Sequence, residues 1–319
     1  MVETAGRITL WGVEVFAAIA DERSISAAAR RLGASPSSVS QQLTNLETAV
    51  GTALIDRSAR PLICTPAGEL FRRRALTIIN EAEQAKAELA AADMTRLTRF
   101  RLGMIEDFDA DVTPALLSDL SKAWPRTQFL LETGASHRLM DQLEARALDV
   151  VVTAEMGDLA DGHEMHPLIE EPFVAAVPKG KVQGDVLDAL RTMPMVQYSS
   201  RHFMGRQIAS QLATQDLRVN HRFELDSYHA ILSMVAAGAG WTILTPLGVL
   251  RAKRFVSEVD IVELPFPSFS RRITLTARRG GLGDLPGDVA TRLKSHMADM
   301  ILKPFHARLP WLKDRMRLL

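Results

Sequence analysis

The sequence has a single cysteine, Cys64, so it cannot form an intramolecular disulfide and offers no set of thiols that could hold a metal. A lone cysteine is more often a small buried hydrophobe than a reactive thiol. No run of residues approaches the ~18 apolar positions that a membrane-spanning helix needs. Met1 to Arg7 is not followed by the apolar core of a signal peptide. We therefore expect a cytoplasmic protein that does not engage a membrane.

Net charge is also lacking, because 38 Lys and Arg residues are balanced by 38 Asp and Glu residues. This balance argues against the broadly basic surface that is typical of nucleic-acid-binding domains. Residues 1–95 hold ten basic and eleven acidic residues, yet their arginines cluster at Arg30-Arg31, Arg57, Arg60 and Arg72-Arg73-Arg74. Attraction to DNA phosphates would therefore depend on the arginines lying on one face of the domain, and on several copies of the domain binding together in an oligomer.

Residues 24–51 are the most informative stretch, because their spacing predicts two helices joined by a tight turn. Gly33 is typical of a helix end, and Ser35 with Pro36 suits the start of the next helix. The first of the two helices can be capped by Ser24 or Ser26. Val39, Leu43, Leu46 and Val50 fall on one apolar face of the second helix.

The opposite face of the second helix is polar and uncharged. Its hydroxyls and amides can donate to and accept from base edges and phosphates. We predict that DNA is contacted by Ser26, Ser35, Pro36, Ser37, Ser38, Ser40, Gln41, Gln42 and Asn45. Taken alone, the stretch could equally be an ordinary helical hairpin with a solvated polar face.

Residues 53–68 follow as a predicted β-hairpin, or wing. Short apolar runs flank an Arg-Ser-Ala-Arg-Pro turn, which supplies Arg57 and Arg60. With this wing added, the first part of the chain resembles the LysR-type transcriptional regulators. The residues that carry the resemblance are Phe16, Ser24, Ser26 to Ala29, Leu32, Ser35 to Ser40, Leu46-Glu47, Gly51, Leu54, Arg57, Arg60, Thr65, Ala67 and Gly68. The chain departs from the family pattern at Pro36, where Gln is frequent, and at Ile55, where Phe is usual.

Length and patterning predict several domains in an α/β chain. We expect a winged helix-turn-helix domain over 1–65 and a long amphipathic helix over 66–95. From Phe100 onward strands and helices alternate, which is typical of parallel sheets with crossover helices. The resemblance implies that the long helix is a dimerising linker and that 96–302 is a two-lobed, periplasmic-binding-protein-like effector domain. The alternative for the long helix is that it lies on its own domain.

We place lobe 1 of this effector domain at about 96–171 and 269–302, and lobe 2 at about 172–268. Residues 303–319 form a tail that packs either on the domain or on a neighbouring subunit.

In open parallel sheets, ligands bind at the carboxyl ends of the strands. We predict effector contacts from Ile105, Glu106, Asp107, Thr133, Ser136, Thr153, Tyr198, Ser199, Ser200, Phe203 and Thr245. Ser136 either helps to bind an anionic group at a helix N-terminus or is a plain N-cap. Carboxylates follow the first strand, where many relatives have Ser or Thr. They would repel an anionic effector unless Arg201 or Arg206 offsets them, so we expect a neutral, zwitterionic or cationic effector.

Catalysis has little support in the sequence. There is no nucleophile elbow, phosphate loop or dinucleotide-binding glycine pattern. His163 and His166 lie three residues apart in a predicted loop, which is a weak metal pattern, and we assign no catalytic residue, metal or cofactor.

We interpret the chain as a transcriptional regulator that binds double-stranded DNA and a small-molecule effector. Self-association into a dimer or tetramer follows from the resemblance, and RNA polymerase is a candidate partner. The alternative is a small-molecule binding protein or enzyme with an accessory helical N-terminal domain.

Overall fold

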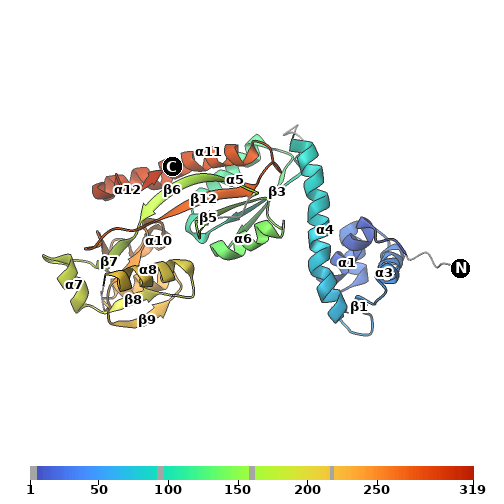
Figure 1. Cartoon of the computed structure of the whole chain (residues 1–319), viewed down its shortest axis with the longest axis horizontal. Coiled ribbons are helices and arrows are strands. Elements are labelled where there is room, and N and C mark those ends of the chain that lie inside the picture. Colours follow the sequence, from blue (N-terminus) through green and yellow to red (C-terminus); the bar gives the residue numbers. More distant parts are fainter. Residues whose placement is uncertain (1–5, 92–96, 158–161, 216–218) are drawn as a thin grey trace. The chain divides into compact units, whose positions relative to one another are not determined.

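The computed structural model describes residues 6–91, 97–157, 162–215 and 219–319 (Figure 1). Contacts divide the chain into two compact units: residues 1–92 with 144–147, and residues 93–143 with 148–319. We call residues 6–91 of the first unit the head and the second unit the effector domain. The predicted end of the linker, 92–95, lies outside the described residues.

The head begins with three helices, α1 (Leu10–Glu22), α2 (Ile25–Leu32) and α3 (Pro36–Val50). The hydroxyls of Ser24 and Ser35 accept backbone N–H groups at the starts of α2 and α3. Gly33 and Gly51 end these two helices in the left-handed conformation that favours glycine. These caps confirm the predicted helix pair. Apolar side chains from all three helices, the wing and the next helix share one core.

The wing pairs β1 (Ile55–Asp56) with β2 (Ile63–Cys64) in an antiparallel hairpin, as predicted. The long helix α4 (Pro66–Ala91) follows and packs on α1, where the rings of Phe16 and Phe71 meet edge to face. Leu70, Leu76 and Ile78 on α4 are exposed. One side of α4 therefore lies on its own domain, while apolar residues remain open elsewhere on it.

Lobe 1 of the effector domain is built on a six-stranded mixed sheet in the order β13-β6-β12-β5-β3-β4. Its parallel part comprises β3 (Arg99–Met104), β4 (Gln128–Thr133) and β5 (Val150–Ala154). Helices α5 (Val112–Ala123) and α11 (Leu285–Met297) pack together on one face, and α6 (Ser136–Glu144) lies on the other (Figure 1). Between β3 and α5 lies a short 3-10 helix, η2 (Glu106–Phe108).

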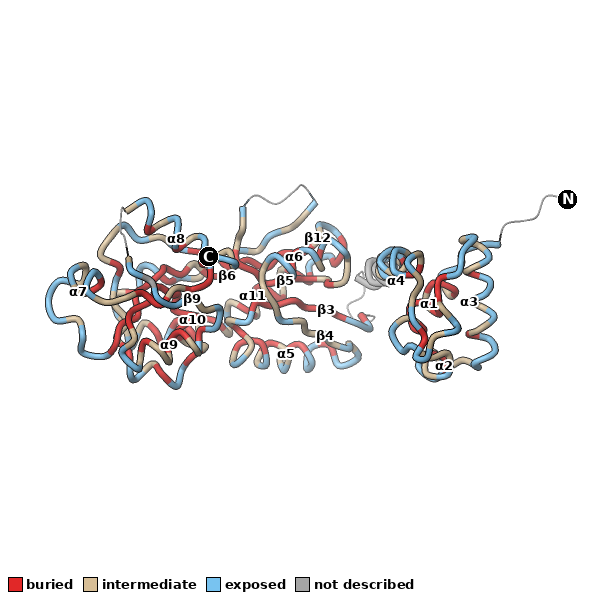
Figure 2. Tube along the Cα trace, turned by 90° about the horizontal axis from the view of Figure 1, so that it is seen from below, coloured by how far each residue is buried: buried red, intermediate tan, exposed pale blue. Residues whose placement is uncertain are grey.

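Lobe 2 has two small sheets. β7 (Val174–Pro178) pairs antiparallel with β10 (Thr242–Leu244) and β11 (Val259–Val262), whereas β8 (Met195–Tyr198) pairs parallel with β9 (His221–Leu225). Its helices are α7 (Val186–Thr192), α8 (Phe203–Thr214), α9 (Tyr228–Ala236) and α10 (Pro246–Arg251), with a 3-10 helix η3 (Lys253–Phe255). Buried apolar residues line the strands of both lobes (Figure 2).

Two long antiparallel strands, β6 (His163–Pro172) and β12 (Ser270–Arg278), carry the chain between the lobes. The expected lobe boundaries, after residue 171 and before residue 269, lie beside the end of β6 and the start of β12. The prediction of a loop around His163 and His166 was wrong, because both belong to β6. The predicted parallel sheet with crossover helices is confirmed for β3, β4 and β5, and the strands β6 and β12 extend this sheet in the antiparallel direction.

The tail packs on the effector domain of its own chain. It forms a π-helical turn η4 (Ala298–Leu302), α12 (Lys303–Arg308), a 3-10 helix η5 (Pro310–Leu312) and β13 (Arg317–Leu318), which pairs with β6. Phe305, Leu312 and Met316 are buried. The tail also reaches lobe 2, where Arg308 donates to the Val256 carbonyl oxygen at 2.6 Å and Arg315 pairs with Glu263 at 2.6 Å.

Candidate DNA interface and effector pocket

The outer face of α3 is polar and open. Ser37, Ser38, Gln41 and Asn45 are exposed, whereas Val39, Leu43 and Leu46 on the inner face are buried. The Gln41 amide donates to the Asn45 side-chain oxygen at 2.9 Å, so the two side chains lie one turn apart on the same face. This arrangement brings most of the predicted DNA-contacting residues together on one exposed surface.

The other predicted residues of the helix pair lie around the two helix starts and along the edge of α3. The Ser35 hydroxyl accepts the Ser38 N–H at 3.2 Å and lies 3.1 Å from the Ser37 hydroxyl. Ser26 and Pro36 are exposed, and Ser40 and Gln42 are half-buried. Ser35 is therefore already used as a cap, whereas Ser26 and Gln42 keep solvent-facing atoms.

The wing is fastened to α3 through Glu47. One oxygen of this carboxylate accepts the N–H groups of Leu54 and Ile55, at 2.8 and 3.1 Å, and the other pairs with Arg57 at 2.8 Å. The Arg57 side chain remains 43% exposed, and it also donates to the Thr44 hydroxyl. Arg57 is thus held between wing and helix with part of its guanidinium still open to solvent.

Arg60 bends back over the wing turn, where it donates to the carbonyl oxygens of Arg57 and Ala59. Ion pairs with carboxylates also hold Arg31, beside Asp21 and Glu22, and Arg72, beside Asp21. These local pairs show where much of the head's arginine charge is balanced. They fit the absence of a net positive charge in the sequence.

The effector domain contains a cavity of about 130 Å³ between the ends of β3 and β5, the start of α6, and α8 and α9. Six of the predicted effector residues line it: Ile105, Glu106, Asp107, Ser136, Tyr198 and Phe203. The carboxyl ends of the strands do therefore converge on a pocket. It is lined by residues of both lobes.

The other five predicted residues lie outside this lining. Thr133 is exposed at the end of β4, and Thr153 faces a neighbouring hollow beneath β5 and β12. Ser199 and Ser200 both bind Glu224, and the short Ser199 hydrogen bond (2.7 Å) lowers the pKa of that carboxyl. Thr245 caps α10 and accepts from a buried arginine.

Ser136 is not the plain N-cap that the sequence allowed. It is the first residue of α6, and its hydroxyl accepts the Ala154 N–H at 3.2 Å, which ties the helix start to the end of β5.

Several lining residues were not predicted: Gly134, Ala135, His137, Ala154, Met156, His202, Met204, Gln207, Asp226, Tyr228 and Arg271. The rings of Tyr228 and Tyr198 lie tilted against each other, with centroids 5.4 Å apart, and both tyrosines are buried. The only sequence signal for Arg271 was a pair of arginines at the start of a strand. Nothing in that signal indicated which carboxylates they would meet.

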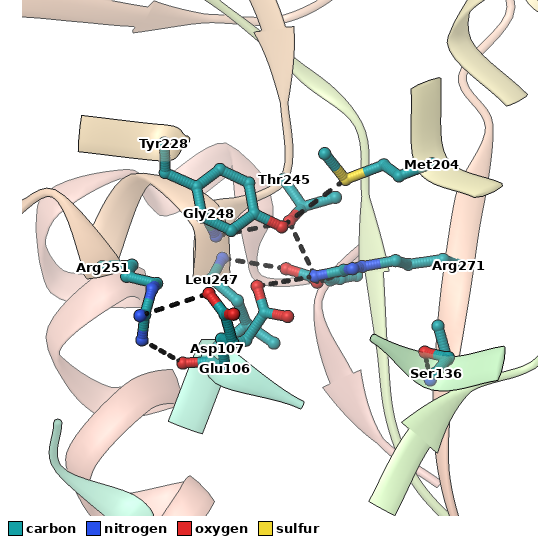
Figure 3. A network of polar contacts seen from close by, with 12 residues as sticks. Glu106, Asp107, Ser136, Met204, Tyr228, Thr245, Leu247, Gly248, Arg251 and Arg271 are labelled. Carbon is teal, nitrogen blue, oxygen red and sulfur yellow. Dashed lines mark hydrogen bonds and ion pairs between the residues drawn. The ribbon is translucent and has the colours of Figure 1, made fainter. Parts of the chain in front are cut away.

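Arg271 lies at the centre of a buried polar network (Figure 3). Its guanidinium pairs with Glu171 at 2.6 Å and with Asp107 at 3.1 Å, and it donates to the Thr245 hydroxyl at 3.0 Å. Glu171 stands directly opposite Arg271 in the β6–β12 register and also accepts the Leu247 N–H at 2.9 Å. The network therefore joins both crossing strands to η2 of lobe 1 and to α10 of lobe 2.

The carboxylates after β3 are paired as well. Arg251 of α10 bonds to Glu106 and Asp109, and Lys253 bonds to Asp111. Arg201 and Arg206, which were expected to offset these acids, do not line the cavity. Arg201 lies 3.8 Å from Asp226, while Arg206 donates to the carbonyl oxygens of Ser200 and Arg201.

Burial shapes the protonation of this network. Burial raises the pKa of Glu171, against the opposing influence of Arg271. Burial also raises the pKa of Tyr228, and the nearby Asp107 carboxylate adds to the effect. Burial raises the pKa of Tyr198 too, so both tyrosines at the cavity stay protonated and their hydroxyls can donate hydrogen bonds.

Among the described residues, no three His, Cys, Asp or Glu side chains come together in a way that could hold a metal ion. His163 and His166 lie on β6 without a third ligand of that kind. None of the helices within the described ranges is long and apolar enough to span a membrane. Cys64 is half-buried in the wing, and burial raises the pKa of its thiol, which disfavours the reactive thiolate.

Comparison with known proteins agrees with this architecture. Residues 10–69 match the model of the bacterial regulatory helix-turn-helix proteins of the lysR family, and residues 96–288 match the LysR substrate binding domain. A probable hydrogen peroxide-inducible genes activator of Mycobacterium avium is 28% identical over 279 residues, which cover 85% of this chain and 88% of the relative.

Two solved structures have the same fold along most of the chain. Full-length OxyR of Pseudomonas aeruginosa, with a cysteine-to-aspartate substitution, has a TM-score of 0.67 at 21% identity, over 90% of this chain and 95% of that one. Full-length CbnR in complex with its target DNA has a TM-score of 0.60 at 18% identity, over 91% of this chain and 99% of that one.

Proposed function

The chain belongs to the LysR family of bacterial transcriptional regulators, and from that premise we propose which of its residues meet DNA and what kind of effector it senses. It is a DNA-binding regulator with an effector-binding domain. The family match favours this function over the alternative of a binding protein or enzyme with an accessory helical domain.

For DNA, we propose that α3 enters the major groove and that the wing lies along the backbone or the adjacent minor groove. The observation that carries this proposal is the exposed polar face of α3, beside a wing whose Arg57 keeps 43% of its side chain open. Ser37, Ser38, Gln41 and Gln42 would lie nearest the base edges or phosphates, and Arg57 with Arg60 would meet phosphates.

The test separates contacts to phosphates from contacts to bases. We expect Arg57→Ala to weaken binding to all sequences and to reduce the slope of log K against log salt by about 1. Gln42→Ala should instead change the preferred sequence, and Arg126→Ala on the exposed surface of the effector domain should change neither. Binding is measured on specific and scrambled DNA at several salt concentrations. An unchanged affinity for Arg57→Ala throughout would rule out the proposed role of the wing.

For the effector, we propose reversible, non-covalent binding in the cavity at η2, α6, α8 and α9. The carrying observation is that Ile105, Ser136, Tyr198 and Phe203, from four separate chain segments, line one cavity. Residues 96–302 contain no cysteine, so this domain has no thiol that could respond to peroxide. In this respect the chain differs from what the name of its relative, a hydrogen peroxide-inducible genes activator, would suggest. We expect millimolar peroxide to leave DNA binding unchanged within minutes.

We further propose that the effector is not a simple anion, because Glu106, Asp107 and Asp226 face the cavity. A thermal-shift screen tests this directly. Stabilisation by dicarboxylates or aromatic acids alone would contradict it.

We also propose that the protein is not an enzyme and acts in the cytoplasm as a dimer or tetramer, with RNA polymerase as a candidate partner. The exposed Leu70, Leu76 and Ile78 on α4 support self-association through that helix, because exposed apolar side chains favour burial against a partner. Light scattering on the full chain and on a Leu76→Glu variant tests the role of α4.

A further inference from the structure

The charged groups that face the effector cavity are mostly acidic. Among its described lining residues, Glu106, Asp107 and Asp226 carry carboxylates, and Arg271 is the only Lys or Arg. His137 and His202 also line it. The Asp, Glu, Lys and Arg side chains of the lining are therefore three carboxylates and one guanidinium.

The positive charge of Arg271 is already shared by groups of the protein. Its Nε donates to Glu171 at 2.7 Å, and its Nη2 donates to Asp107 and to Thr245. The side chains of Arg271, Asp107 and Glu171 are 6%, 6% and 0% exposed, so water screens them little. Two carboxylates with one guanidinium leave a formal charge of −1 in this buried set whenever Glu171 is ionised.

A similar shortage of positive charge recurs beside it. Arg251 serves both Glu106 and Asp109, which again places two carboxylates around one guanidinium. Glu106 nevertheless keeps 58% of its side chain exposed, and Asp226, whose partner Arg201 lies 3.8 Å away, keeps 57%. Because both carboxylates are exposed, each can accept a further hydrogen bond from a ligand without a rearrangement of the protein interior.

Two further features of the lining suit a cation. The rings of Tyr198, Tyr228 and Phe203 border the cavity, and aromatic faces attract cations that bring an apolar skeleton with them. The side-chain oxygen of Gln207 is buried and has no hydrogen-bond partner in the described part of the chain. A buried acceptor without a partner favours a ligand that donates an N–H or O–H to it.

We propose that the effector carries a protonated amine, which binds against Glu106, Asp107 and Asp226 while its carbon skeleton packs on Tyr198, Tyr228 and Phe203. This inference rests on the proposed effector-binding function and names the chemical class of the ligand. The ammonium supplies the positive charge that the cavity wall lacks, and its N–H groups can reach acceptors that include Gln207. The cavity volume of about 130 Å³ fits a small metabolite.

The experiment uses the full chain and ligands that differ only in the charge of one group. One series is n-pentylamine, 1-pentanol and pentanoate; the other is phenethylamine, 2-phenylethanol and phenylacetate. Each compound is added at millimolar concentration, the thermal unfolding midpoint is measured, and affinities follow from calorimetric titration. We expect the amine of at least one series to raise the midpoint, and the alcohol and the carboxylate of that series to leave it in place.

Site variants then locate the amine. Glu106→Gln and Asp226→Asn should each weaken amine binding by about tenfold, as expected for the loss of a hydrogen bond to a charged group. Asp111→Asn is the matched control, because Asp111 pairs with Lys253 and does not line the cavity. Both cavity variants replace exposed carboxylates, so the fold is expected to survive, and the midpoint without ligand checks this.

Three outcomes would overturn the proposal: an alcohol that stabilises as strongly as its amine, no amine in either series that raises the midpoint, or equal effects of Glu106→Gln and Asp111→Asn. Stabilisation by the carboxylates alone would refute the amine and retain a ligand-binding cavity. The DNA-binding part of the proposed function is tested separately by the Arg57→Ala salt series, so the two failures can be distinguished.

Discussion

The head and the effector domain use polar side chains in different ways. In the head, apart from the pair of Arg72 with Asp21, the polar contacts described above are short-range: Ser35 caps the helix that begins at the next residue, and Glu47 binds N–H groups seven and eight residues further on. In the effector domain, Arg271 meets Glu171 and Asp107 at separations of 100 and 164 residues. The head thus keeps its polar groups at the surface for a partner, whereas the effector domain buries some of them to join its lobes.

This difference predicts that a single buried charge matters more to stability than any polar group of the head. Arg271→Met removes the cation and leaves Asp107 and Glu171 buried side by side. We expect a loss of about 3–5 kcal/mol in the free energy of unfolding of the effector domain, measured by urea denaturation. A loss below 1 kcal/mol would show that the network contributes little, and the contrast with the head would fail.

The same variant has a pH dependence of known sign. Without Arg271, the pKa of Glu171 should rise further above that of the unfolded chain, because burial already raises it. A carboxyl with a raised folded-state pKa loses stability as pH rises through that pKa, so the variant's deficit should be larger at pH 8 than at pH 6. Arg272→Met is the matched control, because Arg272 is 53% exposed and should change stability by no more than about 0.5 kcal/mol.

An intermediate effect is expected in the head. Ser35→Ala removes the cap of α3 and should lower the stability of the head by about 1 kcal/mol. Ser38→Ala is the control, because the Ser38 backbone N–H, and not its hydroxyl, makes the capping bond. Thermal unfolding followed by circular dichroism measures both. Equal losses in the two variants would show that the cap is not the source of the effect.

The smallest effect concerns Asp56 in the wing. Hydrogen bonds from the Ser58 hydroxyl and N–H lower the pKa of this carboxyl below its ordinary value of 3.8. A lowered folded-state pKa gives stability that is present above the unfolded value and is lost as pH falls. Ser58→Ala should therefore be slightly less stable than the parent at pH 7, and the gap should close toward pH 3. A gap that widens on acidification would contradict this assignment.

The sequence predicts elements that depend on short-range contacts better than elements that depend on long-range contacts. The caps Ser24 and Ser35 and the turn at Gly33 are local signals, and they placed α2 and α3 within a residue or two. The alternation of strands and helices that was expected from Phe100 onward also holds at β8 and α8, because apolar spacing and flanking breakers lie within a few residues of each other. Local physical chemistry was sufficient for these elements.

Other elements gave no such signal. Strand β6 carries His163, Glu164 and two prolines, a composition typical of a loop, and it is a strand because β12 pairs along its length. Six of the eleven predicted effector residues did reach the cavity, since strand ends converge in this fold. Arg271 and Tyr228 were missed because their roles depend on partners that only the folded chain brings to them.

The tail gives the effector domain a third connection between its lobes. β6 and β12 pair along their length and form one two-stranded ribbon between the lobes. Arg308 and Arg315 fasten the tail to Val256 and Glu263 of lobe 2, while β13 anchors it on β6. A segment that bonds to both lobes would limit how far the lobes can move relative to each other in one direction. The last residues of the chain would thus limit how far the two lobes move apart. The lining of the cavity would determine which ligand binds.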